Sequence, residues 1–193
     1  MLSKIAASLL RLGGWRIQGQ PPSTHRYIAI VAPHTSNWDF MIGLLVRTAL
    51  KIPARFIGKH QLFRPPLGWL MRALGGRPVD RRRSNNLVEG VVKLFEGESE
   101  FVLALTPEGT RSQVSRWKTG FYHISQGANV PIQPVALDYR QRRVVFGPLL
   151  WPGDSKAADM AQLLAFFRCH PGRFRQAIPH YQHQDAPPRQ SRQ

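Results

Sequence analysis

The chain has 193 residues and carries 27 Lys and Arg against 11 Asp and Glu, a formal net charge of +16. Its length suits one domain and is too short for two independent hydrophobic cores. The hydrophobic content of 42% excludes a disordered basic tail. The single cysteine, Cys169, excludes a disulfide framework and a Cys-rich zinc cluster. The excess positive charge leaves three candidate partners: nucleic acid, an anionic membrane surface, or a phosphorylated substrate.

The N-terminal segment predicts a short amphipathic helix. Leu2, Ile5, Leu9 and Leu12 recur at helical spacing, and Gly13-Gly14 ends the pattern. The apolar run is much shorter than the roughly 18–20 residues of a membrane-spanning helix, so no transmembrane helix is expected. The helix either lies on a membrane surface or packs its apolar stripe on the protein's own core, and periodicity alone does not separate these two possibilities.

Strands and helices alternate along the rest of the chain. Apolar runs and helical spacing predict, in chain order, strand 27–32, helix 40–50, strand 54–58, helix 67–74, strand 78–79, helix 84–95, strand 101–105, helix 119–127, strands 131–137 and 143–146, and helix 157–167. Asn37 or Asp39 is expected to cap the helix at 40–50.

This alternation predicts a single α/β domain with a mixed β-sheet flanked by helices. The expected domain spans residues 21–180. The amphipathic segment at residues 1–20 precedes it, and a polar, Pro-rich tail at residues 181–193, expected to be disordered, follows it.

The first polar cluster follows the predicted strand 27–32. Functional groups of α/β sheets gather on loops beyond the carboxyl ends of strands. His34 and Asp39 are five residues apart, which on a helix would point them about 140° apart, so they meet only if a turn folds between them. The carboxylate would then fix the imidazole tautomer, and the second ring nitrogen would accept a proton as a general base. The alternative is a capped turn with a surface histidine.

The second polar cluster follows the predicted strand 101–105 and is the turn Glu108-Gly109-Thr110-Arg111. The planar guanidinium of Arg111 suits a phosphate, and Gly109 allows close approach of the backbone. Glu108 is able to brace an arginine, and Lys118 adds a cation at the edge of the next helix. The alternative is a solvated loop that holds an ion pair.

A third, basic set lies between these clusters, in segments 59–69 and 75–83. Its arginines are candidates for phosphate contacts, although Arg82 and Arg83 are better explained as surface charges. Four apolar side chains of the same set are candidates for the wall of an apolar groove: Phe63, Leu67, Trp69 and Leu70. The alternative is a basic surface loop beside core aromatics.

In this order, the segments resemble the four motifs of the glycerolipid acyltransferase family, which includes the lysophosphatidic acid and glycerol-3-phosphate acyltransferases. The motifs are H-x-x-x-x-D, a Lys- and Pro-containing block that closes in Gly-x-x-Val-Asp-Arg, Glu-Gly-Thr-Arg-Ser followed by an aromatic-Lys-x-Gly, and Val-Pro-Ile. They are matched in turn by His34 with Asp39, by residues 59–81, by residues 108–112 with 117–120, and by residues 130–132.

The resemblance implies a glycerol-3-phosphate acyltransferase-like fold and an O-acyltransferase that forms no acyl-enzyme. It implies that His34 takes the proton of the acceptor hydroxyl, which attacks the thioester of acyl-CoA or acyl carrier protein, and that Asp39 orients His34. The implied acceptor is a lysophospholipid, above all 1-acyl-glycerol-3-phosphate. No metal or cofactor is required, because the thioester is already activated. Six residues are implied to hold the acceptor: Arg81, Glu108, Gly109, Thr110, Arg111 and Lys118.

The resemblance also changes the meaning of the net charge. It implies a peripheral enzyme of phospholipid biosynthesis at the cytoplasmic face of an anionic membrane, with no nucleic acid as partner. Pro33 stands where many members of the family have Asn, which keeps open an acceptor that is an amphiphile without phosphate. Two different functions also stay open: a basic nucleic-acid-binding module, and a membrane-associated binding protein that has kept the fold without the activity.

Overall fold

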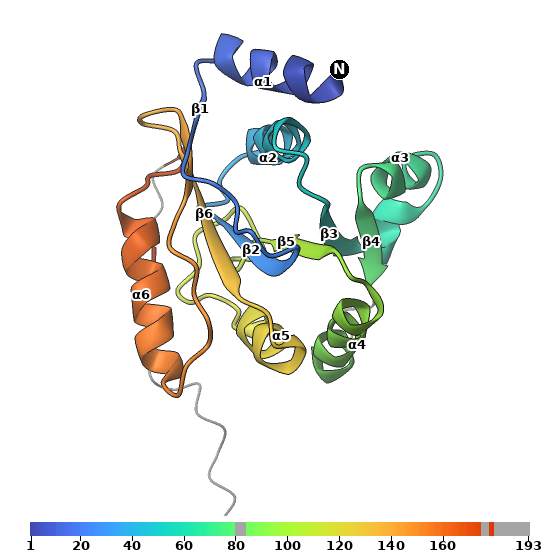
Figure 1. Ribbon diagram of the computed structural model, residues 1–193, viewed down its shortest axis with the longest axis vertical. Helices are drawn as coiled ribbons and strands as arrows, with labels where there is room; N and C mark the ends of the chain where they lie inside the picture. Colours follow the sequence, from blue (N-terminus) through green and yellow to red (C-terminus); the bar gives the residue numbers. More distant parts are fainter. Residues whose placement is uncertain (80–83, 175–177, 180–193) are drawn as a thin grey trace, which may run out of the picture.

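The computed structural model describes residues 1–79, 84–174 and 178–179 (Figure 1). The helices are α1 (Leu2–Leu12), α2 (Asn37–Ala49), the 3-10 helix η1 (His60–Phe63), α3 (Gly68–Ala73), α4 (Ser84–Gly97), α5 (Gly120–Ala128) and α6 (Lys156–Arg168). The strands are β1 (Arg16–Gln18), β2 (Arg26–Ala32), β3 (Ala54–Lys59), β4 (Gly76–Val79), β5 (Phe101–Leu105), β6 (Ile132–Asp138) and β7 (Arg143–Phe146). Arg81 and the expected tail at 181–193 lie outside the described residues.

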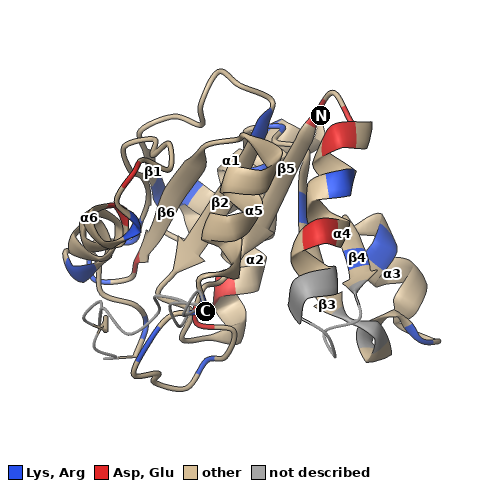
Figure 2. Cartoon of the chain, turned by 90° about the horizontal axis from the view of Figure 1, so that it is seen from below, with Lys and Arg blue, Asp and Glu red and all other residues tan. Residues whose placement is uncertain are grey.

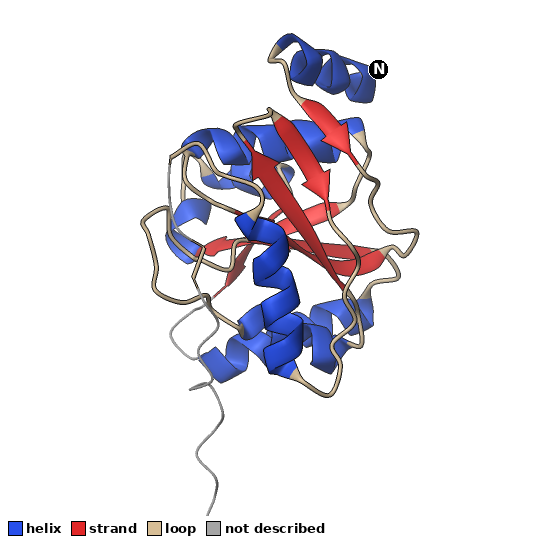
Figure 3. Ribbon diagram, turned by 90° about the vertical axis from the view of Figure 1, so that its left-hand side faces the viewer, coloured by secondary structure: helices blue, strands red, loops and turns tan. Residues whose placement is uncertain are grey.

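Within the described residues, the strands form one seven-stranded sheet in the order β1-β7-β6-β2-β5-β3-β4. Neighbouring strands are parallel except β6 and β7, which are antiparallel. Parallel neighbours need a crossover, and helices supply it: α2 follows β2, and α4 lies between β4 and β5. The predicted single α/β domain with a mixed sheet is therefore confirmed (Figure 3).

Helices cover both faces of the sheet, so side chains are buried on both. Along β2, Ile28 and Ile30 belong to the core cluster that includes side chains of α4, α5 and α6. Tyr27 and Ala29 belong to the cluster on the other face, with Leu10 of α1 and residues of α2. Figure 1 shows α1 and α2 above the sheet and α4 and α5 below it. This two-sided burial explains why β2 is a continuous apolar run rather than an alternating one.

The N-cap of α2 differs from the expectation. Ser36, not Asn37 or Asp39, caps the helix, because its Oγ accepts a hydrogen bond from the amide of Trp38 at 3.2 Å. Asp39 is the third helical residue, and its carboxylate accepts from the amide of Ser36 at 2.7 Å, which completes a capping box. Ser, Asn and Asp are all favourable N-caps, so residue type alone did not select among them.

Two short elements were not predicted. β1 has three residues and pairs with β7 at the edge of the sheet, and η1 has four residues. Such short segments contain too few apolar positions to show a period. Because β1 is a strand of the sheet, segment 1–20 contributes to the domain as well as carrying α1.

The apolar stripe of α1 faces outward instead of packing on the core. The helix packs on α2, and its buried residues are Ala6 and Leu10, which are 4% and 3% exposed; Leu10 shares a core cluster with Ile42 and Val46 of α2. The stripe residues are between 46% and 84% exposed: Leu2, Ile5, Leu9 and Leu12. Over the part of the chain that the structure describes, no helix combines the length and the apolar character needed to cross a membrane.

Candidate active site

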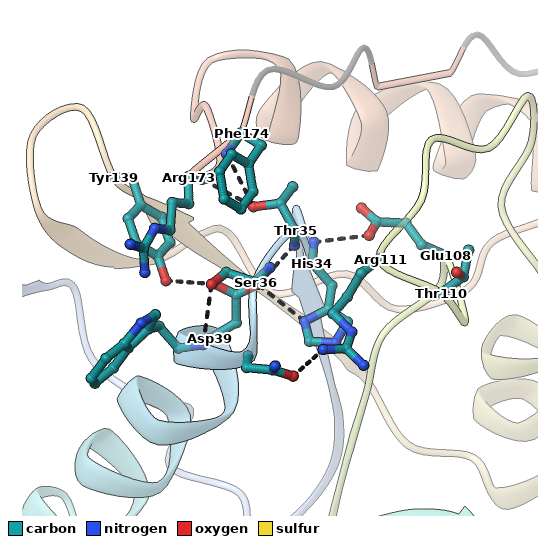
Figure 4. A network of polar contacts seen from close by, with 12 residues as sticks. His34, Thr35, Ser36, Asp39, Glu108, Thr110, Arg111, Tyr139, Arg173 and Phe174 are labelled. Atoms are coloured by element: carbon teal, nitrogen blue, oxygen red, sulfur yellow. Dashed lines mark hydrogen bonds and ion pairs between the residues drawn. The ribbon is translucent and has the colours of Figure 1, made fainter.

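The two predicted polar clusters meet at one end of the sheet. β2 and β5 are parallel neighbours, with Ile30 level with Leu105, so the loops that follow them leave the sheet at the same edge. The loop after β2 carries His34, and the loop after β5 carries Glu108 and Arg111. Figure 4 shows these side chains around one point.

The side chains of His34 and Asp39 are in contact, as the turn between them was predicted to allow. Nδ1 of His34 lies 3.1 Å from Oδ2 of Asp39. The His34 side chain is 22% exposed, whereas the Asp39 side chain is 2% exposed. Because an ionised carboxylate only accepts hydrogen bonds, Nδ1 carries the hydrogen and Nε2 keeps the lone pair. This is the arrangement of a general base with its orienting carboxylate.

Asp39 accepts four hydrogen bonds in a buried position. Besides His34, Oδ2 accepts from the amides of Thr35 and Ser36, each at 2.7 Å, and Oδ1 accepts from the hydroxyl of Tyr139 at 2.6 Å. Burial alone would raise the pKa of the Asp39 carboxyl, but these hydrogen bonds together hold that pKa below its usual value. Asp39 is therefore an anion fixed beside His34.

Glu108 contacts the backbone of the His34 loop rather than facing outward. Its Oε2 accepts a hydrogen bond from the amide of His34 at 2.8 Å, and the residue is 5% exposed. Burial raises the pKa of the Glu108 carboxyl, and the negative charge of Asp39 adds to this rise, although the hydrogen bond from His34 opposes it. Glu108 thus ties the loop after β5 to the loop after β2.

One cation, Arg111, lies on the turn that Glu108 begins, and a second, Lys118, lies against this turn. Nη1 of Arg111 donates to Oδ1 of Asn37, the first residue of α2. Gly109 has a φ of +67°, and a Cβ at this position would lie 3.1 Å from Nζ of Lys118. Glycine therefore permits both the left-handed backbone and the close approach of Lys118. Thr110 is exposed on the same turn.

Sequence reasoning missed contributors that lie far along the chain. Tyr139 is 100 residues from Asp39, to which it donates its hydroxyl hydrogen. The amides of Arg173 and Phe174 donate to Oγ1 of Thr35 at 3.0 and 3.4 Å, so the segment after α6 closes against the His34 turn. Tyr139 directly follows β6, and the rule that functional groups follow the carboxyl ends of strands would have pointed to it.

The arrangement is suited to proton abstraction by His34 next to a positively charged rim, which is formed by Arg111 and Lys118. His34 presents a nitrogen able to accept a proton, the carboxylate of Asp39 is placed where it could stabilise an imidazolium, and Arg111 carries positive charge nearby. Among the described residues, no three His, Cys, Asp or Glu side chains are grouped so that they could hold a metal ion.

Comparison with protein families gives a match to the model described as Acyltransferase over residues 16–138, which contain both loops of the site. A curated relative, the 1-acyl-sn-glycerol-3-phosphate acyltransferase of Saccharomyces cerevisiae, is 28% identical over 130 residues, which are 63% of this chain and 42% of that protein. The protein of the same name from Salmonella typhimurium is 28% identical over 121 residues, 59% of this chain and 48% of that protein. The chain spans less than half the length of these relatives.

The structure is similar to the crystal structure of the 1-acyl-sn-glycerophosphate acyltransferase from Thermotoga maritima. The TM-score is 0.56 at 17% sequence identity, and the match covers 82% of this chain and 71% of the Thermotoga chain. At this identity the similarity concerns the fold. Tyr139 and the segment 171–174 lie beyond the residues matched by the family model, 16–138.

Proposed function

The chain belongs to the acyltransferase family, and we propose that it transfers a fatty acyl group from acyl-CoA or acyl carrier protein to the hydroxyl of a lysophospholipid, in phospholipid biosynthesis. The proposed acceptor is 1-acyl-glycerol-3-phosphate. The contact of His34 Nδ1 with the buried Asp39 at 3.1 Å, beside Arg111, is the observation that carries the proposal. The names of the Saccharomyces and Salmonella relatives support the choice of acceptor.

The proposed mechanism needs one base and no acyl-enzyme. Nε2 of His34 takes the proton of the acceptor hydroxyl as its oxygen attacks the thioester carbonyl. Asp39 stabilises the imidazolium through the hydrogen bond at Nδ1. The tetrahedral intermediate collapses with loss of the thiolate, which takes up the proton from the imidazolium, so that the products are the ester and the free thiol. Positioning and base catalysis suffice because a thioester is an activated acyl donor.

The remaining site residues are proposed to position the acceptor and the base. The acceptor phosphate is bound by Arg111, which lies on the same turn as Gly109 and the exposed Thr110, and by Lys118, whose side chain lies against Gly109. Arg81 is proposed to join them. The carboxylate of Glu108 accepts a hydrogen bond from the amide of His34. Glu108 therefore acts on the acceptor indirectly, by fixing the loop that carries the base.

The test of this function is a thiol-release assay with purified protein. Several lysolipids, with and without phosphate, are dispersed in detergent and offered with acyl-CoA or with acyl carrier protein. We expect thiol release that depends on the acceptor and is greatest with 1-acyl-glycerol-3-phosphate. Thiol release that is equal with and without acceptor would indicate a thioesterase, and no release with any pair would contradict the proposal.

Arg111→Ala is expected to weaken phosphorylated acceptors selectively. Charge-assisted hydrogen bonds to phosphate are worth about 1.5–3 kcal/mol, so KM for 1-acyl-glycerol-3-phosphate should rise by about ten- to 100-fold. An acceptor of equal chain length without phosphate should change by no more than about twofold. Arg116→Ala, on the same loop, is the matched control. An equal loss with both acceptors would remove the phosphate contact from Arg111.

The protein is further proposed to act as a peripheral membrane protein, at the cytoplasmic face. The outward stripe of α1 is the support for this, since exposed apolar side chains on one helix face, flanked by the exposed Lys4 and Arg11, suit an anionic bilayer surface. Further large apolar side chains are exposed on or beside α2 and α3: Trp38, Met41, Leu67 and Trp69. Of the four side chains considered for the wall of an apolar groove, Phe63 is buried, which agrees with the alternative of a core aromatic.

Replacing the four stripe residues of α1 by Gln should lower binding to anionic vesicles at least about tenfold. Partial insertion of four Leu-sized side chains is worth well over the roughly 1.4 kcal/mol that a tenfold change requires. Stability should hold, because these residues are exposed and Gln is a good helix former. Binding is measured by cosedimentation with the vesicles. The control variant is Trp151→Gln, which removes an exposed apolar side chain outside α1; Trp151 is 56% exposed. Equal binding of both variants and wild type would show that α1 does not contact the membrane.

A further inference from the structure

A basic recess lies where β3 and β4 begin, away from the His34 site. Its volume is about 230 Å³, and its walls are Arg55, Arg72, Gly75, Gly76, Arg77 and Pro78. β4 is the edge strand of the sheet, and Figure 2 shows basic residues on β4 and α3 there. Five of these residues lie within the segment 59–81 that matches the second motif, in which Gly76 is a motif position, but the proposed mechanism uses none of the six.

The recess is distant from the proposed base. Arg55 is level with Leu103, and Leu103 is level with Ile28. His34 comes six residues after Ile28, so at about 3.3 Å per residue the Arg55 end of the recess lies about 20 Å from His34 along the strands. Pro78, at the other end of the recess, is level with Gly58 and therefore lies about 10 Å nearer. The recess therefore does not belong to the rim formed by Arg111 and Lys118.

Protein oxygens hold the guanidinium groups at the recess in place. Nη1 of Arg55 donates to Oε1 of Glu98 at 2.5 Å. Nη1 of Arg72 donates to the carbonyl oxygen of Phe63 at 3.2 Å, and its guanidinium lies over the Phe63 ring, 5.7 Å from the centroid. Each guanidinium has five N–H donors, so one such bond fixes the group and leaves other donors to meet a ligand.

A fourth guanidinium reaches the recess from α2. Nη1 of Arg47 donates to the carbonyl oxygen of Leu74 at 2.7 Å. Gly75 has a φ of +87°, and a Cβ there would lie 3.2 Å from Nη2 of Arg47 and 3.1 Å from the carbonyl oxygen of Ala54. Glycine at this position lets the Arg47 guanidinium lie against the wall of the recess.

The positive charge of this cluster exceeds the negative charge that the structure places against it. Glu98 contacts Arg55 and lies 4.0 Å from Arg77. Burial and the positive charge of Arg55 lower the pKa of Arg47, which shows that the guanidinium groups act on one another. A bound anion would offset this repulsion.

We propose that this recess is a second anion site, which binds a phosphomonoester group through Arg55, Arg72 and Arg77, with Arg47 behind them. Forked guanidinium donors match phosphate oxygens in pairs, and the glycine backbone leaves room for them. If the proposed function holds, two molecules of the reaction carry such a group, namely the 3′-phosphate of CoA and the headgroup of a phosphatidate-type lipid. The site itself does not depend on that function.

The test compares phosphate binding by two double variants. Arg72→Gln with Arg77→Gln removes two exposed charges from the recess, whereas Arg16→Gln with Arg142→Gln removes two exposed charges on β1 and directly before β7, at the opposite edge of the sheet. Titration calorimetry uses adenosine 3′,5′-bisphosphate as one probe and short-chain phosphatidate as the other. We expect the first variant to weaken at least one probe by at least about tenfold and the second variant by no more than about twofold.

The outcomes separate the two sources of phosphate. A loss confined to adenosine bisphosphate assigns the site to the acyl donor, and a higher KM for acyl-CoA but not for its 3′-dephospho analogue would agree. A loss confined to phosphatidate assigns it to a lipid headgroup. If Arg72→Gln with Arg77→Gln binds both probes as tightly as the wild type does, the proposal is overturned. Binding requires no turnover, so protein without transferase activity that binds through the recess would refute the proposed function and leave this site intact.

Discussion

His34→Ala is expected to lower kcat for acyl transfer by at least about 100-fold, the usual scale for loss of a general base. The acceptor is an alcohol, whose hydroxyl proton is held far too tightly to leave at neutral pH without a base. Nδ1 of His34 is committed to Asp39, so Nε2 is the nitrogen that receives this proton. KM for the acceptor should change little, since the phosphate contacts are made by other residues.

The matched control is His25→Ala. His25 has a side chain that is 69% exposed and lies at the start of β2, at the other end of this strand from His34. Circular dichroism should show the wild-type fold for both variants, which separates loss of the base from loss of the fold; His34→Ala should be the less stable of the two, because Asp39 loses one hydrogen bond. Turnover by His34→Ala at the wild-type rate would remove the general base from the proposed mechanism.

The sequence allowed a contact between His34 and Asp39, because the residues between them favour a turn, but it left a capped turn with a surface histidine equally open. It was not sufficient to say how the turn closes. Ser36 caps α2 while Asp39 accepts its amide, and this pairing depends on backbone geometry that three equally suitable cap residues do not reveal. The position of Tyr139 directly after β6 marked it as a candidate, but its hydrogen bond to a residue 100 positions away leaves no local pattern in the sequence.

The role of α1 shows a different limit of sequence reasoning. The spacing of its leucines predicts a helix, and α1 is one. Hydrophobicity did not decide which face packs: Ala6 and Leu10 are buried, whereas the stripe of Leu2, Ile5, Leu9 and Leu12 is left exposed. Close packing of helices favours residues that fit the facing surface, and that surface is known only once α2 is in place.

The two buried carboxylates of the site differ in environment and so in proposed role. Asp39 receives enough hydrogen bonds for its pKa to fall despite burial, whereas Glu108 receives fewer and its pKa rises. Carboxyl groups whose pKa values are moved apart in this way serve different purposes. Asp39 supplies the fixed negative charge that an imidazolium needs, and Glu108 supplies an acceptor for the His34 amide.

Asp39→Asn is expected to reduce kcat by about 100-fold or more, because an amide cannot supply the negative charge that stabilises the His34 imidazolium. The same change should lower the free energy of unfolding by about 1–2 kcal/mol at neutral pH, since the capping box of α2 loses its carboxylate. Tyr139→Phe is a milder variant for comparison. It removes one of the hydrogen bonds to Asp39 but leaves the charge of Asp39, so kcat should fall by only about tenfold or less.

The pH dependence of stability distinguishes a charged Asp39 from a merely well-packed one. Its pKa is lower in the folded protein than in the unfolded chain, so its contribution is present above the unfolded value of about 4 and is lost as the pH falls through the folded value. The stability difference between wild type and Asp39→Asn, measured by urea unfolding, should therefore be constant near neutral pH and shrink below about pH 4. In Tyr139→Phe the Asp39 pKa is less depressed, so the acid loss should be smaller and complete at a higher pH. A difference that does not change with pH would mean that Asp39 is not held as an anion, and the stabilisation of the imidazolium would then have to come from another group.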